Sequence, residues 1–148
     1  MKTLYAVLLA ALVGFGGVVT AQDKAAPKIE GSYTIVAGVK DGVKAKIDQD
    51  GKPTTVTIDA KVIYLGEKGK GFKIGYKLVG TDTPTKVELK ILEAPPPFAD
   101  AKGTPAYGLV AAKGDTLKLA YSLDKEQQPT DFSGKNGFAF EMKKNAAK

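Results

Sequence analysis

Residues 86–91 read Lys-Val-Glu-Leu-Lys-Ile, with an apolar side chain at every second position. Successive side chains of a β-strand point to opposite faces of a sheet, whereas a helix repeats its apolar positions every three to four residues. Val87, Leu89 and Ile91 therefore share one face, and the charged residues between them share the other. This alternation predicts a strand that is buried on one side and solvated on the other.

The same period of two returns along the rest of the chain. It is clear in residues 33–37, 56–58, 72–78, 117–121 and 138–142, and weaker in 61–65 and 106–112. Turn-forming residues stand between these segments at 41–42, 50–51, 66–71, 81–84 and 114–115. Counting 86–91, the pattern predicts about eight strands, and the short connections favour antiparallel neighbours.

A sheet of this size has to protect its edge strands, and closure into a barrel removes the edges. We therefore predict an all-β fold, a small antiparallel up-and-down β-barrel of about eight strands, with a two-sheet sandwich as the alternative. Residues 39–47 could form a helical turn across one end of the barrel. The longest connection, 93–105, contains three consecutive prolines and must be extended. Phe98 in it is either an apolar plug of the barrel mouth or part of a plain connector.

The N-terminus has the layout of a secretory signal. Lys2 precedes an apolar stretch over residues 4–19, and small residues, Val19 and Ala21, stand at the positions that signal peptidase reads. We predict a signal peptide over 1–21, a flexible leader over 22–28, the barrel domain over 29–144 and a tail over 145–148. An uncleaved membrane anchor is the alternative, although the stretch is short for a span and contains three glycines. The product is expected to be exported, to the periplasm or the extracellular space, without a membrane span after cleavage.

The composition excludes several kinds of chemistry. The chain has no histidine, cysteine or tryptophan, and all 22 of its basic residues are lysine. The common nucleophile–base pairs and thiolate or imidazole metal sites are therefore excluded, as is lipid attachment at a cysteine. Recognition of specific nucleic-acid sequences favours arginine, so we do not expect it. We expect neither an enzyme nor a cofactor, and we assign no catalytic and no metal-binding residue.

Two motifs resemble known sites but do not match them. Asp48 and Asp50, with Asp59 further on, open like a calcium loop, but Lys52 and Pro53 follow where an EF-hand needs an acidic ligand and a glycine. A hairpin turn with solvated carboxylates explains them better. The glycines and lysines of 66–71 match neither phosphate-binding fingerprint, and they predict a hairpin tip.

The two ends of the domain resemble a known family. Residues 114–121 read GDTLKLAY, residues 128–133 read QPTDFS, and a last apolar strand ends in two lysines. Together with the start of the domain, Ile29 to Tyr33, they resemble an uncharacterised lipocalin-like domain family of exported planctomycete proteins. Tyr33 stands where that family has tryptophan, and Gln128 where it commonly has arginine. The resemblance implies a lipocalin-like barrel and export, and it brings no catalytic residues.

Two functions remain open at this point. The first is a non-enzymatic barrel that binds a small apolar or amphipathic ligand in its interior. Its lining would come from inward-facing residues, which could equally be plain core: Tyr33, Ile35, Ile58, Tyr76, Leu89, Leu109, Leu119 and Phe140. The second is a cell-envelope or matrix interaction module, which would bind an anionic envelope polymer through its lysine-rich outer face. A hollow interior favours the first function, and a packed interior favours the second.

Overall fold

A computed structural model describes residues 26–49, 52–67 and 69–146. The predicted signal peptide lies outside these residues. The described part contains no α-helix, and its only helical elements are two short 3-10 turns, η1 (Ala99–Ala101) and η2 (Lys125–Gln127). No helix in these ranges is long and apolar enough to cross a membrane.

The described chain is otherwise built of β-strands and their connections. The strands are β1 (Gly31–Lys40), β2 (Val43–Lys44), β3 (Asp48–Gln49), β4 (Lys52–Pro53), β5 (Thr55–Ile58), β6 (Val62–Leu65), β7 (Phe72–Val79), β8 (Thr85–Glu93), β9 (Pro105–Lys113), β10 (Thr116–Ser122) and β11 (Phe138–Lys144). The weaker strands predicted at 61–65 and 106–112 are present as β6 and β9. β3 and β4 pair only with each other, so they form a separate small hairpin.

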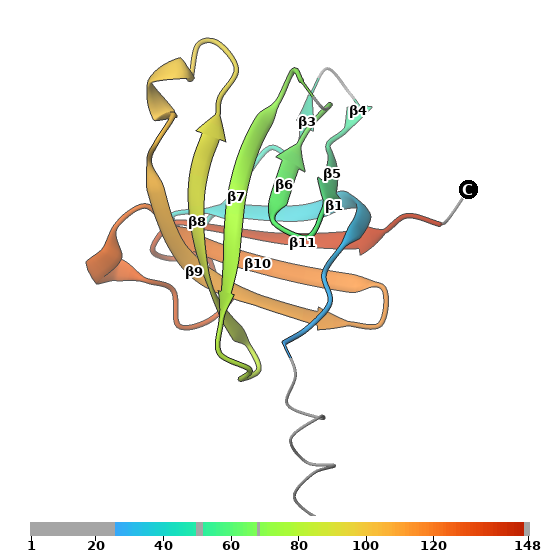
Figure 1. Ribbon diagram of the computed structural model, residues 1–148, viewed down its shortest axis with the longest axis vertical. Coiled ribbons are helices and arrows are strands. Elements are labelled where there is room, and N and C mark those ends of the chain that lie inside the picture. Colours follow the sequence, from blue (N-terminus) through green and yellow to red (C-terminus); the bar gives the residue numbers. More distant parts are fainter. Residues whose placement is uncertain (1–25, 50–51, 68, 147–148) are drawn as a thin grey trace, which may run out of the picture.

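Eight of the strands close into an antiparallel barrel. From β5 to β11, each strand pairs with its neighbours in sequence order. β1 joins the two ends of this series, because it pairs with β5 on one side and with β11 on the other. The predicted eight-stranded barrel is therefore confirmed, and the sandwich is excluded. In Figure 1, β6, β7 and β8 stand upright while β1, β10 and β11 run across them, so the barrel is flattened into two crossing layers.

The connections gather at two ends of the barrel, because the strands run alternately up and down. We call one end the loop end; it carries the connections β1–β5, β6–β7, β8–β9 and β10–β11. We call the other the leader end; it carries the shorter turns β5–β6, β7–β8 and β9–β10 and the chain leading into β1. The two ends therefore differ in how much chain surrounds them.

The helical turn expected within residues 39–47 is absent. Asp41 and Gly42 have φ angles of 50° and 83°, which belong to the left-handed region. Asp-Gly tolerates this region well and favours a tight hairpin turn. The chain consequently folds back on itself, and β2 pairs with the end of β1, Lys40 opposite Val43.

The core lies inside the barrel, as the alternation of the strands predicts. The largest fully buried side chains are Leu117, Met142, Val110 and Thr85. The one polar member of this group has a partner, since the Thr85 hydroxyl donates to the Asp82 carbonyl oxygen at 2.6 Å. Alternation is interrupted where the β1–β11 register shifts between Ile35 and Ala37: Val36 and Ala37 are both exposed, and Gly38 is the next buried residue.

Candidate functional site

Seven of the eight predicted lining residues belong to the barrel interior. Tyr33, Ile35, Ile58 and Leu89 are buried members of the core cluster, and Tyr76, Leu119 and Phe140 are partly buried and pack against it. They come from β1, β5, β7, β8, β10 and β11, so the interior is built from nearly the whole barrel wall.

Leu109 does not line the interior, and the prediction for it is corrected. Its neighbours Ala106 and Val110 are in the core cluster, and Gly108 and Val110 stand opposite the inward residues Val87 and Thr85 of β8. Leu109 itself stands opposite Lys86, which is exposed. It therefore belongs to the outward face, although it is buried there.

The centre of the barrel is filled by its own side chains. The cavity there measures about 10 Å³. Such a volume holds at most about one water molecule. It is lined only by apolar side chains, those of Ile29, Val56, Ile58, Ile63, Val87, Val110, Leu117, Leu119 and Met142. The interior is therefore a packed core, and of the two functions set out above this favours the interaction module. A ligand-binding function would require a site outside the barrel centre.

Tyr33 helps to close the leader end of the barrel. Its hydroxyl donates to the carbonyl oxygen of Ile29 at 2.9 Å, and both residues are buried. Burial raises the pKa of Tyr33, and the carboxylate of Glu30 raises it further. Gln128 is not part of this floor, because it is exposed in the β10–β11 connection at the loop end. Tyr33 and Gln128 therefore lie at opposite ends of the barrel, and the Tyr33 hydroxyl finds its partner in the chain that leads into β1 instead.

A groove of about 460 Å³ lies beside this floor, between the leader and β7. We call it the side groove. It exists because β6 is half as long as β7: their pairing ends at Val62 and Gly75, and the β6-facing edge of β7 then makes one more backbone bond, from Tyr76 to the Lys61 carbonyl oxygen at 3.0 Å. Beyond that bond no strand among the described residues covers this edge of β7.

The side groove combines an apolar floor with a basic rim. Ile29, Tyr76 and Leu78 supply the apolar surface, and the exposed Lys28, Lys61 and Lys77 stand around it. Its other lining residues are Pro27, Glu30 and Ala60. Among the lining residues three lysines stand against one glutamate, while Asp59 is close enough to act on Tyr76 and Glu88 stands opposite Lys77, so the positive charge of the rim is partly offset.

Tyr76 connects the two walls of the side groove. Its hydroxyl donates to the Asp59 carbonyl oxygen at 2.7 Å, which ties β7 to the β5–β6 turn. Burial raises the pKa of Tyr76, with smaller contributions from Glu30, Asp59 and Tyr33. The phenol therefore stays neutral at physiological pH and serves as a fixed wall.

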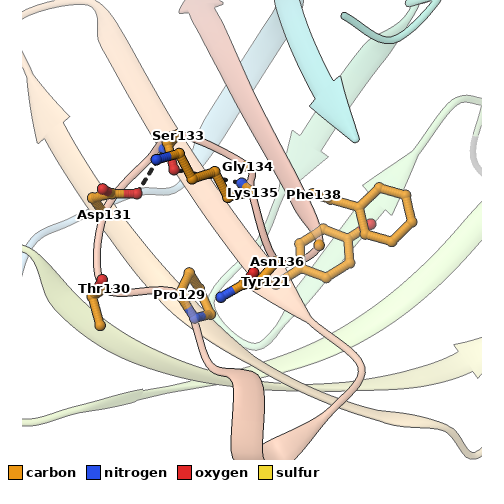
Figure 2. Close-up of a pocket in the computed structure, with 10 residues that line it drawn as sticks. Tyr121, Pro129, Thr130, Asp131, Ser133, Gly134, Lys135, Asn136 and Phe138 are labelled. Atoms are coloured by element: carbon orange, nitrogen blue, oxygen red, sulfur yellow. Dashed lines mark hydrogen bonds between the residues drawn. The ribbon is translucent and has the colours of Figure 1, made fainter. Parts of the chain in front are cut away.

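A second pocket, of about 210 Å³, lies at the loop end under the β10–β11 connection. We call it the loop pocket. Figure 2 shows the rings of Tyr121 and Phe138 on one side of it and Asp131 and Ser133 on the other. The two rings stack with their centroids 5.0 Å apart. This pocket is more polar than the side groove, since most of its lining comes from residues 129–137.

Phe98 lies on the rim of the loop end. Its ring contacts that of Phe72 in β7, with the centroids 5.7 Å apart, yet the side chain remains 55% exposed. Phe98 therefore rests on the rim and does not enter the barrel as a plug.

The outer face carries lysines and glutamates in register. Lys77 stands opposite Glu88 and Lys118 opposite Glu141 in neighbouring strands, and Lys73 and Glu93 form an ion pair at 3.5 Å. Opposite charges at cross-strand positions reduce the net field of the face. The face therefore offers an anionic polymer no concentrated basic patch at these positions.

No family model matches the chain, and no curated protein or solved structure matches it. The resemblance to the lipocalin-like family stays a prediction. The function has to be argued from the chain's own residues. Within the described ranges, no three acidic side chains gather closely enough to hold a metal ion. β3 and β4 do form a hairpin around the predicted 50–51 turn, which itself lies outside those ranges.

The sequence reasoning missed both the side groove and the loop pocket. The side groove has a signal in the sequence, because the apolar alternation is short before the 66–71 turn and long after it. Two paired strands of unequal length leave one edge uncovered. The loop pocket has no such signal, since its walls come from a connection without periodicity.

Proposed function

We propose that the mature chain, exported by cleavage after Ala21, is a non-enzymatic binding protein for an amphipathic anion such as a fatty acid. The side groove is the binding site. The observation that carries the proposal is the contrast in volume and lining: about 10 Å³ in the barrel centre against about 460 Å³ in the groove. An apolar chain would cover Ile29, Tyr76 and Leu78, and an anionic head group would lie among the rim lysines.

The composition supports a binding role, since no histidine or cysteine is available for the common catalytic pairs. Burial of apolar ligand surface contributes about 25 cal/mol per Å² before the costs of association. The lysines add orientation more than affinity, because exposed charge pairs contribute only about 0.2–1 kcal/mol each. We therefore expect micromolar binding with a clear preference for an anionic head group.

The experiment titrates the mature chain, starting at Gln22, with a fluorescent fatty-acid analogue and displaces it with an unlabelled fatty acid. Lys61→Ala with Lys77→Ala should weaken binding by about threefold to tenfold, because two exposed charge pairs are lost. The matched control removes two lysines from the outer face, Lys86→Ala with Lys90→Ala, and should leave the affinity unchanged. Equal weakening by both pairs, or an absence of saturable binding at micromolar concentration, would contradict the proposal.

A second matched pair tests the apolar floor. Leu78 lines the groove, whereas its neighbour Val79 points the other way and is 39% exposed. Leu78→Asp should abolish saturable binding and Val79→Asp should retain it. Circular dichroism of both variants is the control, and both should give the β-sheet spectrum of the wild type.

A further inference from the structure

The loop pocket carries an inference that is independent of the side groove. The pocket lies at the loop end, and the groove lies at the leader end. Its volume of about 210 Å³ is below the roughly 300 Å³ at which sites for drug-sized ligands begin. Its occupant is therefore a small molecule or the terminal unit of a larger one.

The lining of the pocket has two chemically different sides. Tyr121 and Phe138 stack on each other, and Lys40 Nζ lies 5.4 Å from the centroid of the Phe138 ring, so the two rings give the pocket an apolar wall and not a pair of open ring faces. Hydrogen-bonding side chains stand on the connection itself: Thr130, Asp131, Ser133, Lys135 and Asn136. A ligand that matches both sides has a C–H face and several hydroxyl groups, which is the chemistry of a sugar ring.

The polar side of the pocket is fixed before any ligand arrives. The Asp131 carboxylate accepts a hydrogen bond from the Ser133 backbone N–H at 2.9 Å, as Figure 2 shows. The connection is also tied to the turn after β1, because Gly42 N–H donates to the Gly134 carbonyl oxygen at 2.9 Å and Asp41 N–H to that of Gly137 at 2.8 Å. A fixed loop loses little conformational entropy on binding.

The charges of the pocket favour a neutral ligand. Asp131 is held ionised, since its hydrogen bonds with Ser133 lower the pKa of the carboxyl. A carboxylate accepts strong hydrogen bonds from hydroxyl groups and repels other anions. Lys135 balances its charge, so the pocket as a whole is neither an anion site nor a cation site. We propose that the loop pocket binds one neutral sugar unit.

The test uses the isotope-labelled mature chain and a panel of neutral methyl glycosides, observed by amide chemical shifts. At least one glycoside should shift the amides of residues 133–138 saturably at millimolar concentration, while amides around the side groove stay unchanged. Methyl glucuronide is the anionic arm of the panel. Shifts with glucuronide alone would make this an anion site through Lys135 and overturn the proposal, as would no response to any glycoside.

Two variants with matched controls locate the binding. Asp131→Asn keeps an oxygen for the Ser133 N–H but removes the charge, and Asn136→Ala removes an amide that lines the pocket; each should weaken binding by about threefold to tenfold. Glu126→Gln and Gln127→Ala make the same chemical changes at exposed positions of the same connection, outside the pocket. They should leave the affinity unchanged, and weakening by the controls to the same extent would overturn the assignment. Fatty-acid binding in the side groove should be the same in all four variants.

Discussion

Tyr121 shows how strongly a single residue depends on the surrounding fold. Its ring, from β10, is stacked on Phe138 and lies close to Phe140, both in β11. Burial raises the pKa of its phenol from 10.0 to about 12. In the unfolded chain the phenol ionises near pH 10, whereas in the barrel it stays neutral for about two further pH units. The folded state is therefore penalised increasingly as the pH rises through this window.

We predict a specific loss of stability between pH 10 and pH 12. Below pH 10 the phenol is neutral in both states, so its ionisation does not affect stability. As the pH approaches 12, ionisation of the phenol in the unfolded chain lowers the free energy of unfolding by on the order of 2 kcal/mol. Urea unfolding of the wild type and of Tyr121→Phe measures this. The free energy of unfolding of the wild type should fall more steeply with pH than that of the variant. Parallel curves would show that the phenol is not buried as described.

At this scale the sequence predicts side-chain direction well but not perfectly. Alternation correctly gives Ile35, Ile58 and Leu89 an inward direction. It fails at Leu109, because 106–112 has apolar or small residues at nearly every position and no alternation to set the register. The register is fixed instead by Gly108, which pairs with Val87 and Tyr121. Only the neighbouring strands supply this information.

Two strand glycines show what holds neighbouring elements together. A Cβ atom at Gly108 in β9 would meet the carbonyl oxygen of Ala120 in β10, whereas one at Gly75 in β7 would lie 3.4 Å from the flexible side chain of Leu92. Neither glycine has a positive φ, so the difference is one of space alone.

We predict that Gly108→Ala lowers the free energy of unfolding by about 1–3 kcal/mol, since β9 and β10 must separate to fit the methyl group. Gly75→Ala should change it by less than about 0.5 kcal/mol. Urea midpoints with unchanged slopes give both values. Similar destabilisation by both substitutions would mean that β-strand glycine is needed for a reason other than close backbone approach.

The strands themselves are the part of the fold that the sequence predicts best. All the alternating segments appear as strands, because half-burial imposes a period of two wherever one face meets a core. The helical turn expected within 39–47 is wrong, because Asp41 takes up a left-handed conformation in the turn that lets β2 pair with β1. The side groove joins segments that are distant in the sequence, and its one sequence signal is the unequal length of the alternation before and after the 66–71 turn. The loop pocket lies within residues 121–138, most of which have no periodicity from which a pocket could be predicted.

For the whole molecule, the decisive property is that the barrel is full. Leu117 is 1% exposed and lines the small central cavity, whereas Leu123, just after β10, is 51% exposed. Leu117→Ala should lower the free energy of unfolding by about 2–5 kcal/mol, because the barrel can collapse only partly around the vacated space. Leu123→Ala should change it by less than about 0.5 kcal/mol.

Ligand titrations of these two variants extend the test. The Leu117→Ala protein has room in its centre, so it should gain binding of a small apolar probe such as benzene, which the wild type should lack. Leu123→Ala should behave as the wild type. Central binding of benzene by the wild type would contradict a packed interior and would return the ligand site to the barrel centre.

The pairing of β1 with β11 has a consequence for how the molecule is made. Tyr33 stands opposite Lys144 in this pairing, so a residue at the start of the barrel domain pairs with one at its end. A chain shortened by β11 would leave β1 and β10 with open edges, which are templates for aggregation. The barrel can therefore close only when its last strand is present, and until then both of these edges stay open.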